Sequence, residues 1–154
     1  MTVSVTLQVA TAAKGLPSRA SLARWAQAAL GGMRRRDVSV TMRIVGKRES
    51  AALNSQFRRK SGPTNVLSFQ FETFPGIRSN LLGDVVICAD VVRREAREQG
   101  KTERAHWAHM VVHGIMHLRG YDHQSNKDAA VMEARETRIL RTLGFPNPYA
   151  QLSP

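Results

Sequence analysis

The residues with the clearest capacity for chemistry in this chain are its five histidines, all of which fall between His106 and His123. His113 and His117 are four residues apart, and residues at that spacing lie on the same face of a helix. Gly120 can leave a helix in a left-handed conformation and turn the chain back, which would bring His123 to the same point. Three imidazoles around one ion, with a fourth position open, are typical of a catalytic zinc site. This segment therefore predicts a metal-dependent enzyme.

Three further polar residues lie close to these expected ligands. At about 100° per residue, four of the five histidines share an arc of roughly 80° on one helix face. His109, one turn before His113, is a candidate for contact with the metal ligands or the substrate, whereas His106 is interpreted as structural. Asp122 could orient a ligand imidazole through its second nitrogen, stabilise the turn or act as a base. We favour orientation or turn stabilisation for Asp122.

The residue after the first histidine bears on the class of reaction. The spacing of His113, His117, Gly120 and His123 matches HExxHxxGxxH, the pattern of a class of zinc proteases in which the glutamate is the general base. Here that position is Gly114, which cannot accept a proton. The sequence therefore argues against a protease of this mechanism, although a metal could still generate hydroxide and polarise a phosphoryl or carbonyl oxygen.

The charge balance of the chain favours a polyanionic partner. Lysine and arginine number 23 against 12 acidic residues, so the formal net charge is +11. Neutralisation of phosphates with release of counterions drives non-specific binding to nucleic acids. A solvated, arginine-rich surface is the alternative interpretation, so the charge supports nucleic-acid binding without establishing it.

Length and composition are typical of one soluble domain over residues 1–154. A hydrophobic content of 42% is enough to fill one core. No apolar run approaches the roughly 20 residues of a membrane helix, and the N-terminus lacks the layout of a signal peptide. Cys88 is the only cysteine, so an intrachain disulfide is impossible and a reducing compartment is expected. We therefore expect a cytoplasmic protein.

The hydrophobic pattern predicts an α+β fold in which a small, mixed, mostly parallel four-stranded sheet is covered by about five helices. The predicted strands are residues 3–9, 38–45, 66–71 and 84–88, with a loop from Glu72 to Leu82. The predicted helices lie between Ser18 and Gly31 and near 48–57, 89–99, 103–118 and 126–143. The second helix is expected to bury Leu53 and Phe57. A single domain of this kind resembles a zinc hydrolase in layout.

Three segments resemble the YbeY family of bacterial ribosomal RNA maturation factors. They are HWAHMVVHGIMHLRGYDH at 106–123, FRRKSGPTNVLSFQF at 57–71 and LGDVVI at 82–87. They occur in the family's order, and the resemblance runs from about Leu53 to Pro148. It implies a metal-dependent, single-strand-specific endoribonuclease that takes part in 16S ribosomal RNA 3′-end processing and in 70S ribosome quality control.

The resemblance also implies roles for individual residues. His113, His117 and His123 would be the ligands of one zinc ion, and Arg58 would be the essential basic residue of the cleft. Arg58 belongs to the family's arginine-glycine-lysine motif, from which this chain departs, because the glycine is replaced by Arg59 and the aspartate after the motif by Ser61. Which arginine faces the substrate is therefore open, although position favours Arg58.

Two polar residues of the predicted third strand are weaker candidates for substrate contact. Asn65 and Ser68 could bind the RNA backbone or ribose, but hydrogen bonding within the turn and strand is the slightly favoured interpretation. The general base is unassigned, with Asp122, His109 and the metal hydroxide as candidates.

The resulting hypothesis is hydrolysis of single-stranded RNA, with RNA and the small ribosomal subunit as partners and neither membrane nor DNA expected. One alternative is a metal-dependent hydrolase of another substrate, including a peptidase with a base from elsewhere. A second is a non-catalytic ribosome-assembly factor with a structural zinc, closed by a fourth protein ligand. Cys88 or His109 could supply that ligand.

Overall fold

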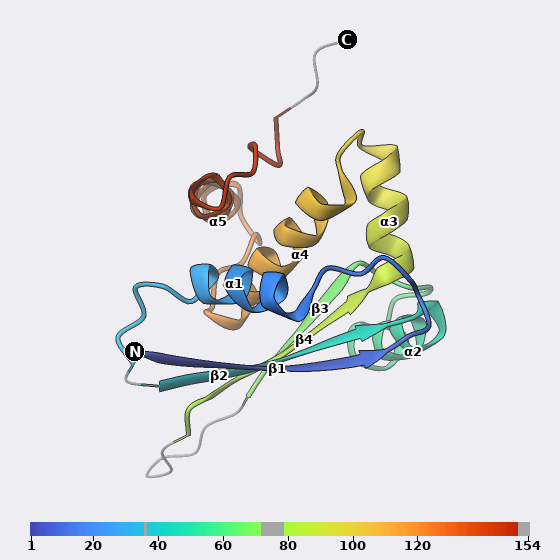
Figure 1. The fold of residues 1–154 in the computed structure, drawn as a ribbon, viewed down its shortest axis with the longest axis horizontal. Coiled ribbons are helices and arrows are strands. Elements are labelled where there is room, and N and C mark those ends of the chain that lie inside the picture. The colour runs from blue at the N-terminus through green and yellow to red at the C-terminus, as the bar shows by residue number, and fades with distance from the viewer. Residues whose placement is uncertain (36, 72–78, 151–154) are drawn as a thin grey trace.

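The computed structural model describes residues 1–35, 37–71 and 79–150, and its elements follow the predicted order (Figure 1). Within these residues the order of strands and helices is βαβαββααα, which confirms the sequence-based prediction. The strands are β1 (Thr2–Ala10), β2 (Asp37–Val45), β3 (Val66–Gln70) and β4 (Leu81–Cys88). The helices are α1 (Arg19–Ala29), α2 (Lys47–Arg58), α3 (Ala89–Glu98), α4 (Glu103–Leu118) and α5 (Asn126–Thr142).

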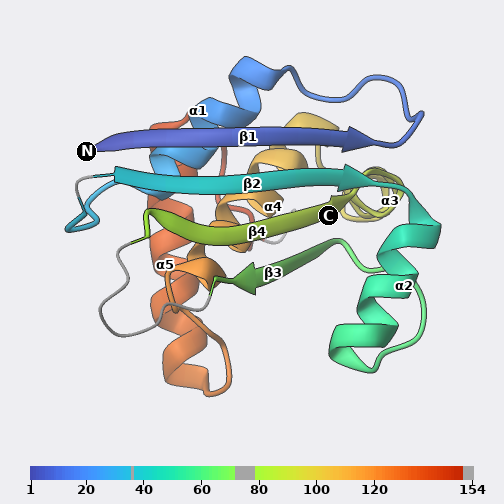
Figure 2. The same cartoon turned by 90° about the horizontal axis from the view of Figure 1, so that it is seen from below.

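The four strands form one mixed sheet with the spatial order β1-β2-β4-β3 (Figure 2). β1, β2 and β4 are parallel, whereas β3 pairs antiparallel with β4 in a register that sets Val66 opposite Ile87 and Gln70 opposite Gly83. β3 therefore forms an edge of the sheet. The prediction of a mostly parallel, mixed sheet is confirmed.

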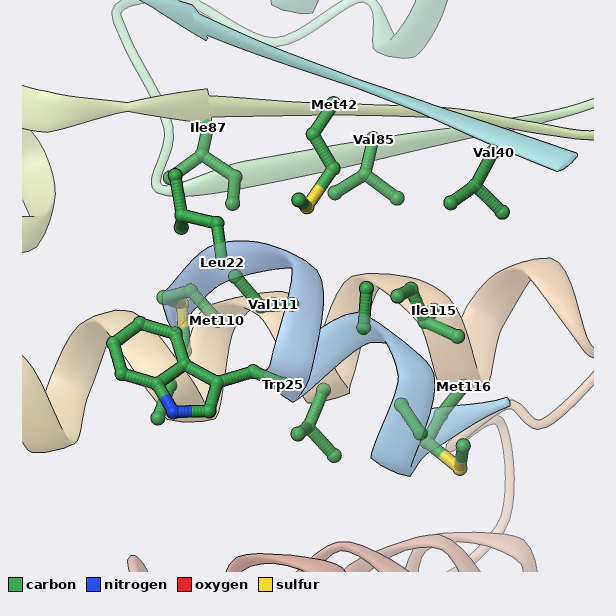
Figure 3. Close-up of a cluster of buried hydrophobic side chains, with 14 of the residues drawn as sticks. Leu22, Trp25, Val40, Met42, Val85, Ile87, Met110, Val111, Ile115 and Met116 are labelled. Atoms are coloured by element: carbon green, nitrogen blue, oxygen red, sulfur yellow. The ribbon is translucent and has the colours of Figure 1, made fainter. Parts of the chain in front are cut away.

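One face of the sheet carries the main core, which α1, α4 and α5 cover (Figure 1). Alternate residues of β2 and β4 point towards the helices because side chains of a strand alternate between its two faces. Figure 3 shows Met42 and Val85 of these strands facing Leu22 of α1 and Val111 and Ile115 of α4, and all five side chains are buried. Burial of each such side chain contributes about 1.5–3 kcal/mol to folding.

Helix α4 lies at the centre of the molecule and contacts the sheet, α1, α3 and α5. Buried residues therefore occur on nearly all of its sides, from His106 to Leu118. A helix surrounded in this way is held rigidly, which suits it to carry functional side chains. In the part of the chain that the structure describes, no helix combines the length and apolar character needed to cross a bilayer.

Strand β4 begins at Leu81, three residues before the predicted start at Asp84. The pairing with β2 shifts register between Ser39 and Val40, where Leu82 is the extra residue. Leu82 is 6% exposed and belongs to the core. A bulge adds one residue to a strand and so breaks the alternation from which the strand was predicted. Most of the loop predicted from Glu72 to Leu82 lies outside the described residues.

Helix α2 is present as predicted, but the prediction that it buries Phe57 is wrong. Phe57 is 54% exposed and Leu53 is half-buried. The buried residues of α2 are instead polar, namely Ser50 and Asn54, and both hydrogen-bond to carbonyl groups of residues 62–64. α2 packs at one end of the sheet, where the sheet offers little surface to cover (Figure 2). Its inner face therefore fixes the loop that precedes β3.

Candidate functional site

Three histidines from the end of α4 and the loop after it converge on one point. Ring nitrogens of His113, His117 and His123 all lie within 4.8 Å of one another. The Nε2 atoms of His113 and His117 are 3.1 Å apart, and two nitrogens bonded to one tetrahedral zinc ion would be about 3.3 Å apart. Burial, followed by the nearby His113 and His123, lowers the pKa of His117 to about 4. His117 is therefore neutral near pH 7, as metal coordination requires.

The turn that brings the third histidine back forms as the sequence predicts. α4 ends at Leu118, and Gly120 follows with a φ of +96°. The N–H of Gly120 donates to the carbonyl oxygen of His117 at 3.0 Å, and the next N–H donates to the carbonyl oxygen of Met116 at 3.0 Å. A side chain at Gly120 would be strained because L-residues rarely adopt this conformation. The chain therefore reverses within two residues and returns His123 to the end of the helix.

The carboxylate of Glu136, on α5, holds the first histidine in position. It accepts hydrogen bonds from Nδ1 of His113 at 3.0 Å, Nε2 of His109 at 2.7 Å and the hydroxyl of Tyr149 at 2.9 Å. The side chain of Glu136 is fully buried. When Nδ1 of His113 carries the proton, its Nε2 is left with a free lone pair beside His117. Glu136 therefore sets both the tautomer and the orientation of His113.

The electrostatics of this buried network keep Glu136 ionised. Burial acts to raise the pKa of Glu136, but the hydrogen bonds from His109 and His113 outweigh burial and lower the pKa to about 2. Burial likewise lowers the pKa of His109 and raises that of Tyr149. An ionised carboxylate away from water requires such donors, because an unpaired buried charge is strongly destabilising.

The described residues contain two groups of donors that could hold a metal ion. The first is His113, His117 and His123, and the second is His109, His113 and Glu136. The first group lines an open cleft, whereas the donor atoms of the second are bonded to one another around a fully buried carboxylate. A catalytic ion needs an open coordination position. The first group therefore fits such an ion better, and the second fits the role of supporting it.

The three histidines form one wall of a cleft of about 640 Å³, and β3 with the loop before it forms the other. Arg58 and Lys60 line the cleft from this second side, and Asp122 lies beside the histidines. The cleft is therefore bordered by two cations and one carboxylate in addition to the imidazoles. This composition suits a ligand that carries phosphate groups.

Of the two neighbouring arginines that the sequence leaves open, Arg58 lines the cleft and Arg59 does not. Nη2 of Arg58 is 3.5 Å from the carbonyl oxygen of Ser68, so most of its donors face open space. Arg59 caps the end of α2 in a left-handed conformation with a φ of 55°. The unusual conformation of Arg59 separates the directions of the two side chains.

Asn65 and Ser68 line the cleft, but their side chains are already engaged within the protein. Nδ2 of Asn65 donates to the carboxylate of Glu95 at 3.0 Å, and its Oδ1 accepts the N–H of Val66 at 2.6 Å. The hydroxyl of Ser68 donates to the carbonyl oxygen of Gly114 at 2.8 Å. Both residues therefore connect β3 to the helices behind it, as the slightly favoured interpretation expected.

Asp122 and His109 differ in their access to the cleft. Asp122 has a half-exposed side chain, and its Oδ1 lies 3.7 Å from Nδ1 of His123 and accepts the backbone N–H of His123 at 2.8 Å. His109 is 7% exposed and contacts Glu136 and Tyr149 instead of the cleft. The link from His109 to the three-histidine group therefore runs through Glu136.

Gly114 faces the sheet, which explains why the position after the first histidine is so small. A Cβ atom there would lie 2.6 Å from Cγ1 of Val85 and 3.0 Å from Cγ2 of Val66. A glutamate at this position would have no room and would point away from the three histidines. The argument against a glutamate-based protease mechanism therefore gains a steric basis.

The other candidates lie outside the three-histidine group. His106 is buried, and its Nε2 contacts Glu95 at 2.9 Å. Cys88 is buried in a small apolar cluster at the end of β4, and it is absent from both donor groups of the described residues. Neither Cys88 nor His109 is placed to close the three-histidine group as a fourth ligand.

Sequence reasoning missed Glu136, although the sequence holds a signal for it. Met132, Glu136 and Leu140 are spaced by four residues and are the buried residues of α5. A carboxylate in the middle of an apolar helix face requires a buried donor, and histidines are the natural partners. Tyr149 carried no comparable signal because it follows a proline-containing loop without periodicity.

Comparison with known proteins gives consistent matches for the fold and the site. The family model described as endoribonuclease YbeY matches residues 10–144. An endoribonuclease YbeY of Methylococcus capsulatus is 53% identical over 152 residues, which cover 99% of each chain. The solution structure of TM1509 from Thermotoga maritima superposes with a TM-score of 0.55 at 29% identity, covering 88% of this chain and 87% of that one. Each match includes all three histidines of the cleft within the aligned length of the chain or most of it.

Proposed function

The chain belongs to the endoribonuclease YbeY family and is an RNA-cleaving hydrolase with a role in ribosomal RNA processing, and we propose that it is a zinc-dependent endoribonuclease specific for single strands. Its proposed substrate is the 3′ end of 16S ribosomal RNA on the small ribosomal subunit, in the cytoplasm, where it would also serve ribosome quality control. The observation that carries the zinc proposal is the convergence of three histidines in a basic cleft.

The proposed mechanism is hydrolysis of a phosphodiester in the cleft. His113, His117 and His123 would hold zinc, which supplies Lewis-acid chemistry towards a phosphoryl oxygen and makes water more acidic. A water oxygen attacks phosphorus and loses a proton to a base, while the bond to one ribose oxygen breaks and that oxygen takes up a proton. Arg58 would bind the phosphate and neutralise the charge that develops on its oxygens.

Among the side chains considered as the base, Asp122 fits the cleft better than His109. Asp122 lines the cleft and is half exposed, so it can approach a water molecule there. His109 is directed to Glu136 and Tyr149, and burial lowers its pKa. We therefore assign proton transfer to Asp122 or to the ionised water itself, and a positioning role to His109.

The shape of the cleft supports a single strand as substrate. Tyr121 lies in its lining beside the histidines, and an aromatic ring offers a stacking surface for an unpaired base. Bases in a duplex are stacked on one another and cannot reach such a ring. The cations of the other wall can meanwhile contact the backbone.

The test compares zinc content and RNA cleavage for wild type, His117→Ala and Arg58→Gln. The substrates are a single-stranded RNA that spans the mature 3′ end of 16S ribosomal RNA, the same RNA in a duplex, and DNA of the same sequence. We expect stoichiometric zinc in the wild type and in Arg58→Gln but not in His117→Ala, and cleavage of the single-stranded RNA by the wild type alone. Zinc-free wild type that cleaves at full rate would contradict the zinc proposal, and equal cleavage of the duplex would contradict strand specificity.

The two alternatives make different predictions in the same assay. A hydrolase of another substrate would cleave a denatured protein in a chelator-sensitive reaction and leave RNA intact. A non-catalytic assembly factor would retain zinc under strong chelation and cleave neither polymer. The open side of the three-histidine group argues against the second alternative, because structural zinc sites are closed by four protein ligands.

A further inference from the structure

A second hollow adjoins the cleft that contains the three histidines. It has a volume of about 400 Å³ and lies between the turn after α1 and the turn after α4. The two hollows share Gly120 and Tyr121 in their linings. A Cβ atom at Gly120 would meet nothing within 4 Å, so the boundary between the hollows is open. A chain-like ligand can therefore pass from one hollow to the other across this glycine.

The second hollow is strongly basic. Its lining contains Arg34, Arg35 and Arg119, and none of its described lining residues is acidic. Arg34 and Arg35 are exposed on the turn between α1 and β2. Three guanidinium groups in one hollow repel one another unless an anion lies between them, so this arrangement is suited to binding one.

Arg119 is held in a fixed position at the floor of this hollow. Its Nη1 donates to the carbonyl oxygens of Ala29 at 2.7 Å and of Gly31 at 3.1 Å, at the end of α1. These bonds use the two N–H groups of Nη1 and leave the N–H groups of Nε and Nη2 free of them. Because Arg119 is already ordered, a phosphate bound to it would cost little side-chain entropy.

Tyr121 adds an aromatic surface where the two hollows meet. The guanidinium carbon of Arg119 lies 5.9 Å from the centre of its ring, and that of Arg135 lies 6.0 Å from it. The ring is partly exposed. Alternation of cations with an aromatic ring along a groove is typical of surfaces that bind single-stranded nucleic acid, because the cations follow the phosphates and the ring stacks on a base.

We propose that this hollow, formed by Arg34, Arg35, Arg119 and Tyr121, binds the single-stranded RNA that flanks the bond to be cleaved. The inference rests on the proposed function, since it extends the same substrate beyond the three-histidine cleft. The flanking strand crosses the boundary at Gly120, stacks a base on Tyr121 and places its next phosphates between Arg119 and the two arginines of the turn. The hollow thereby adds affinity for long substrates without contributing to the chemical step.

The test uses Arg34→Gln/Arg35→Gln in the full chain, with Arg138→Gln/Arg141→Gln as the control. The control removes the same charge from exposed positions on α5 that line neither hollow. The ligands are a minimal single-stranded RNA containing the cleavage sequence and the same RNA extended by unpaired uridines on its 5′ or 3′ side. Binding is measured by fluorescence anisotropy over a series of salt concentrations, after chelation so that the RNA is not consumed, and cleavage is measured separately with zinc.

We expect the wild type to bind one of the extended RNAs more tightly than the minimal RNA, and the double variant to lose this difference. For the extended RNA, the slope of log K against log salt should fall by about 1.4, since each phosphate contact on a single strand contributes about 0.7. The minimal RNA and the control variant should show no change.

Equal weakening for the minimal and the extended RNA, or equal weakening by the control pair, would overturn the inference. If instead poly-glutamate bound in an Arg34- and Arg35-dependent manner and RNA did not, the hollow would be a surface for an acidic protein. Binding that depends on these arginines together with an absence of cleavage would overturn the proposed catalytic function and leave this inference standing.

Discussion

Replacement of Glu136 by glutamine tests whether the buried carboxylate supports the metal site. The substitution preserves size and shape but replaces one acceptor oxygen with an amino group. Three donors point at this carboxylate, from His113 at 3.0 Å, His109 at 2.7 Å and Tyr149 at 2.9 Å. The amide can satisfy some of them, but its own N–H groups then face a donor. We expect His113 to lose the fixed tautomer and orientation that direct its Nε2 to the cleft.

The expected size of the effect follows from two contributions. Loss of a carboxylate that orients a metal-bound histidine typically weakens metal affinity by 10- to 100-fold, or about 1.4–2.7 kcal/mol. A buried polar group without a partner costs a further 1–3 kcal/mol, roughly, of folding free energy. The metal-free Glu136→Gln variant should therefore remain folded but melt at a lower temperature than the wild type.

The assay is competition for zinc with a chromophoric chelator at pH 7, on protein shown by circular dichroism to be folded. Glu133→Gln, an exposed position on the same helix, is the matched control and should bind zinc like the wild type. Tyr149→Phe removes one donor and leaves the contact with His113, so it should lower stability more than zinc affinity. A Glu136→Gln variant with wild-type zinc affinity would refute the positioning role of Glu136.

Three further predictions follow from the described contacts. Gly114→Ala should lower the melting temperature by a few degrees, because about 1–3 kcal/mol of overpacking against the sheet exceeds about 1 kcal/mol gained in helix propensity. Glu95→Gln should destabilise the protein by about 1–3 kcal/mol at pH 7 in urea unfolding, because buried His106 loses its partner. The hydrogen bond from His106 lowers the pKa of Glu95, so the stabilisation is complete above pH 4.5 and disappears as the pH falls through the lowered pKa. The difference between this variant and the wild type should therefore narrow in acid. Arg58→Gln should reduce kcat/KM for RNA far more than Arg59→Gln, because only Arg58 lines the cleft, and equal losses would contradict this assignment.

Much of the fold could be predicted because it depends on short-range periodicity. The parallel strands alternate with period two, and α1, α4 and α5 begin at Ser18, Thr102 and Ser125, whose side chains accept a backbone N–H three residues later. Where local pattern and packing differ, the prediction failed. The bulge at Leu82 interrupts the alternation of β4, and Phe57 remains exposed because α2 lies at an end of the sheet.

The sequence by itself determined the three-histidine group, because both of its relations are local. His113 and His117 are one helical turn apart, and Gly120 permits the tight reversal that returns His123. Such geometry depends on backbone conformation over a few residues and does not require the rest of the fold.

Only the tertiary structure decided what surrounds these histidines. Glu136 lies on another helix and reaches His113 because α5 packs on α4. Arg58 reaches the same cleft because β3 lies beside α4, and Arg34 lies near it because α1 ends where α4 ends. Contacts between residues distant in sequence are set by how elements pack, so spacing along the chain could name the metal ligands but not their supporting carboxylate or the path of the substrate.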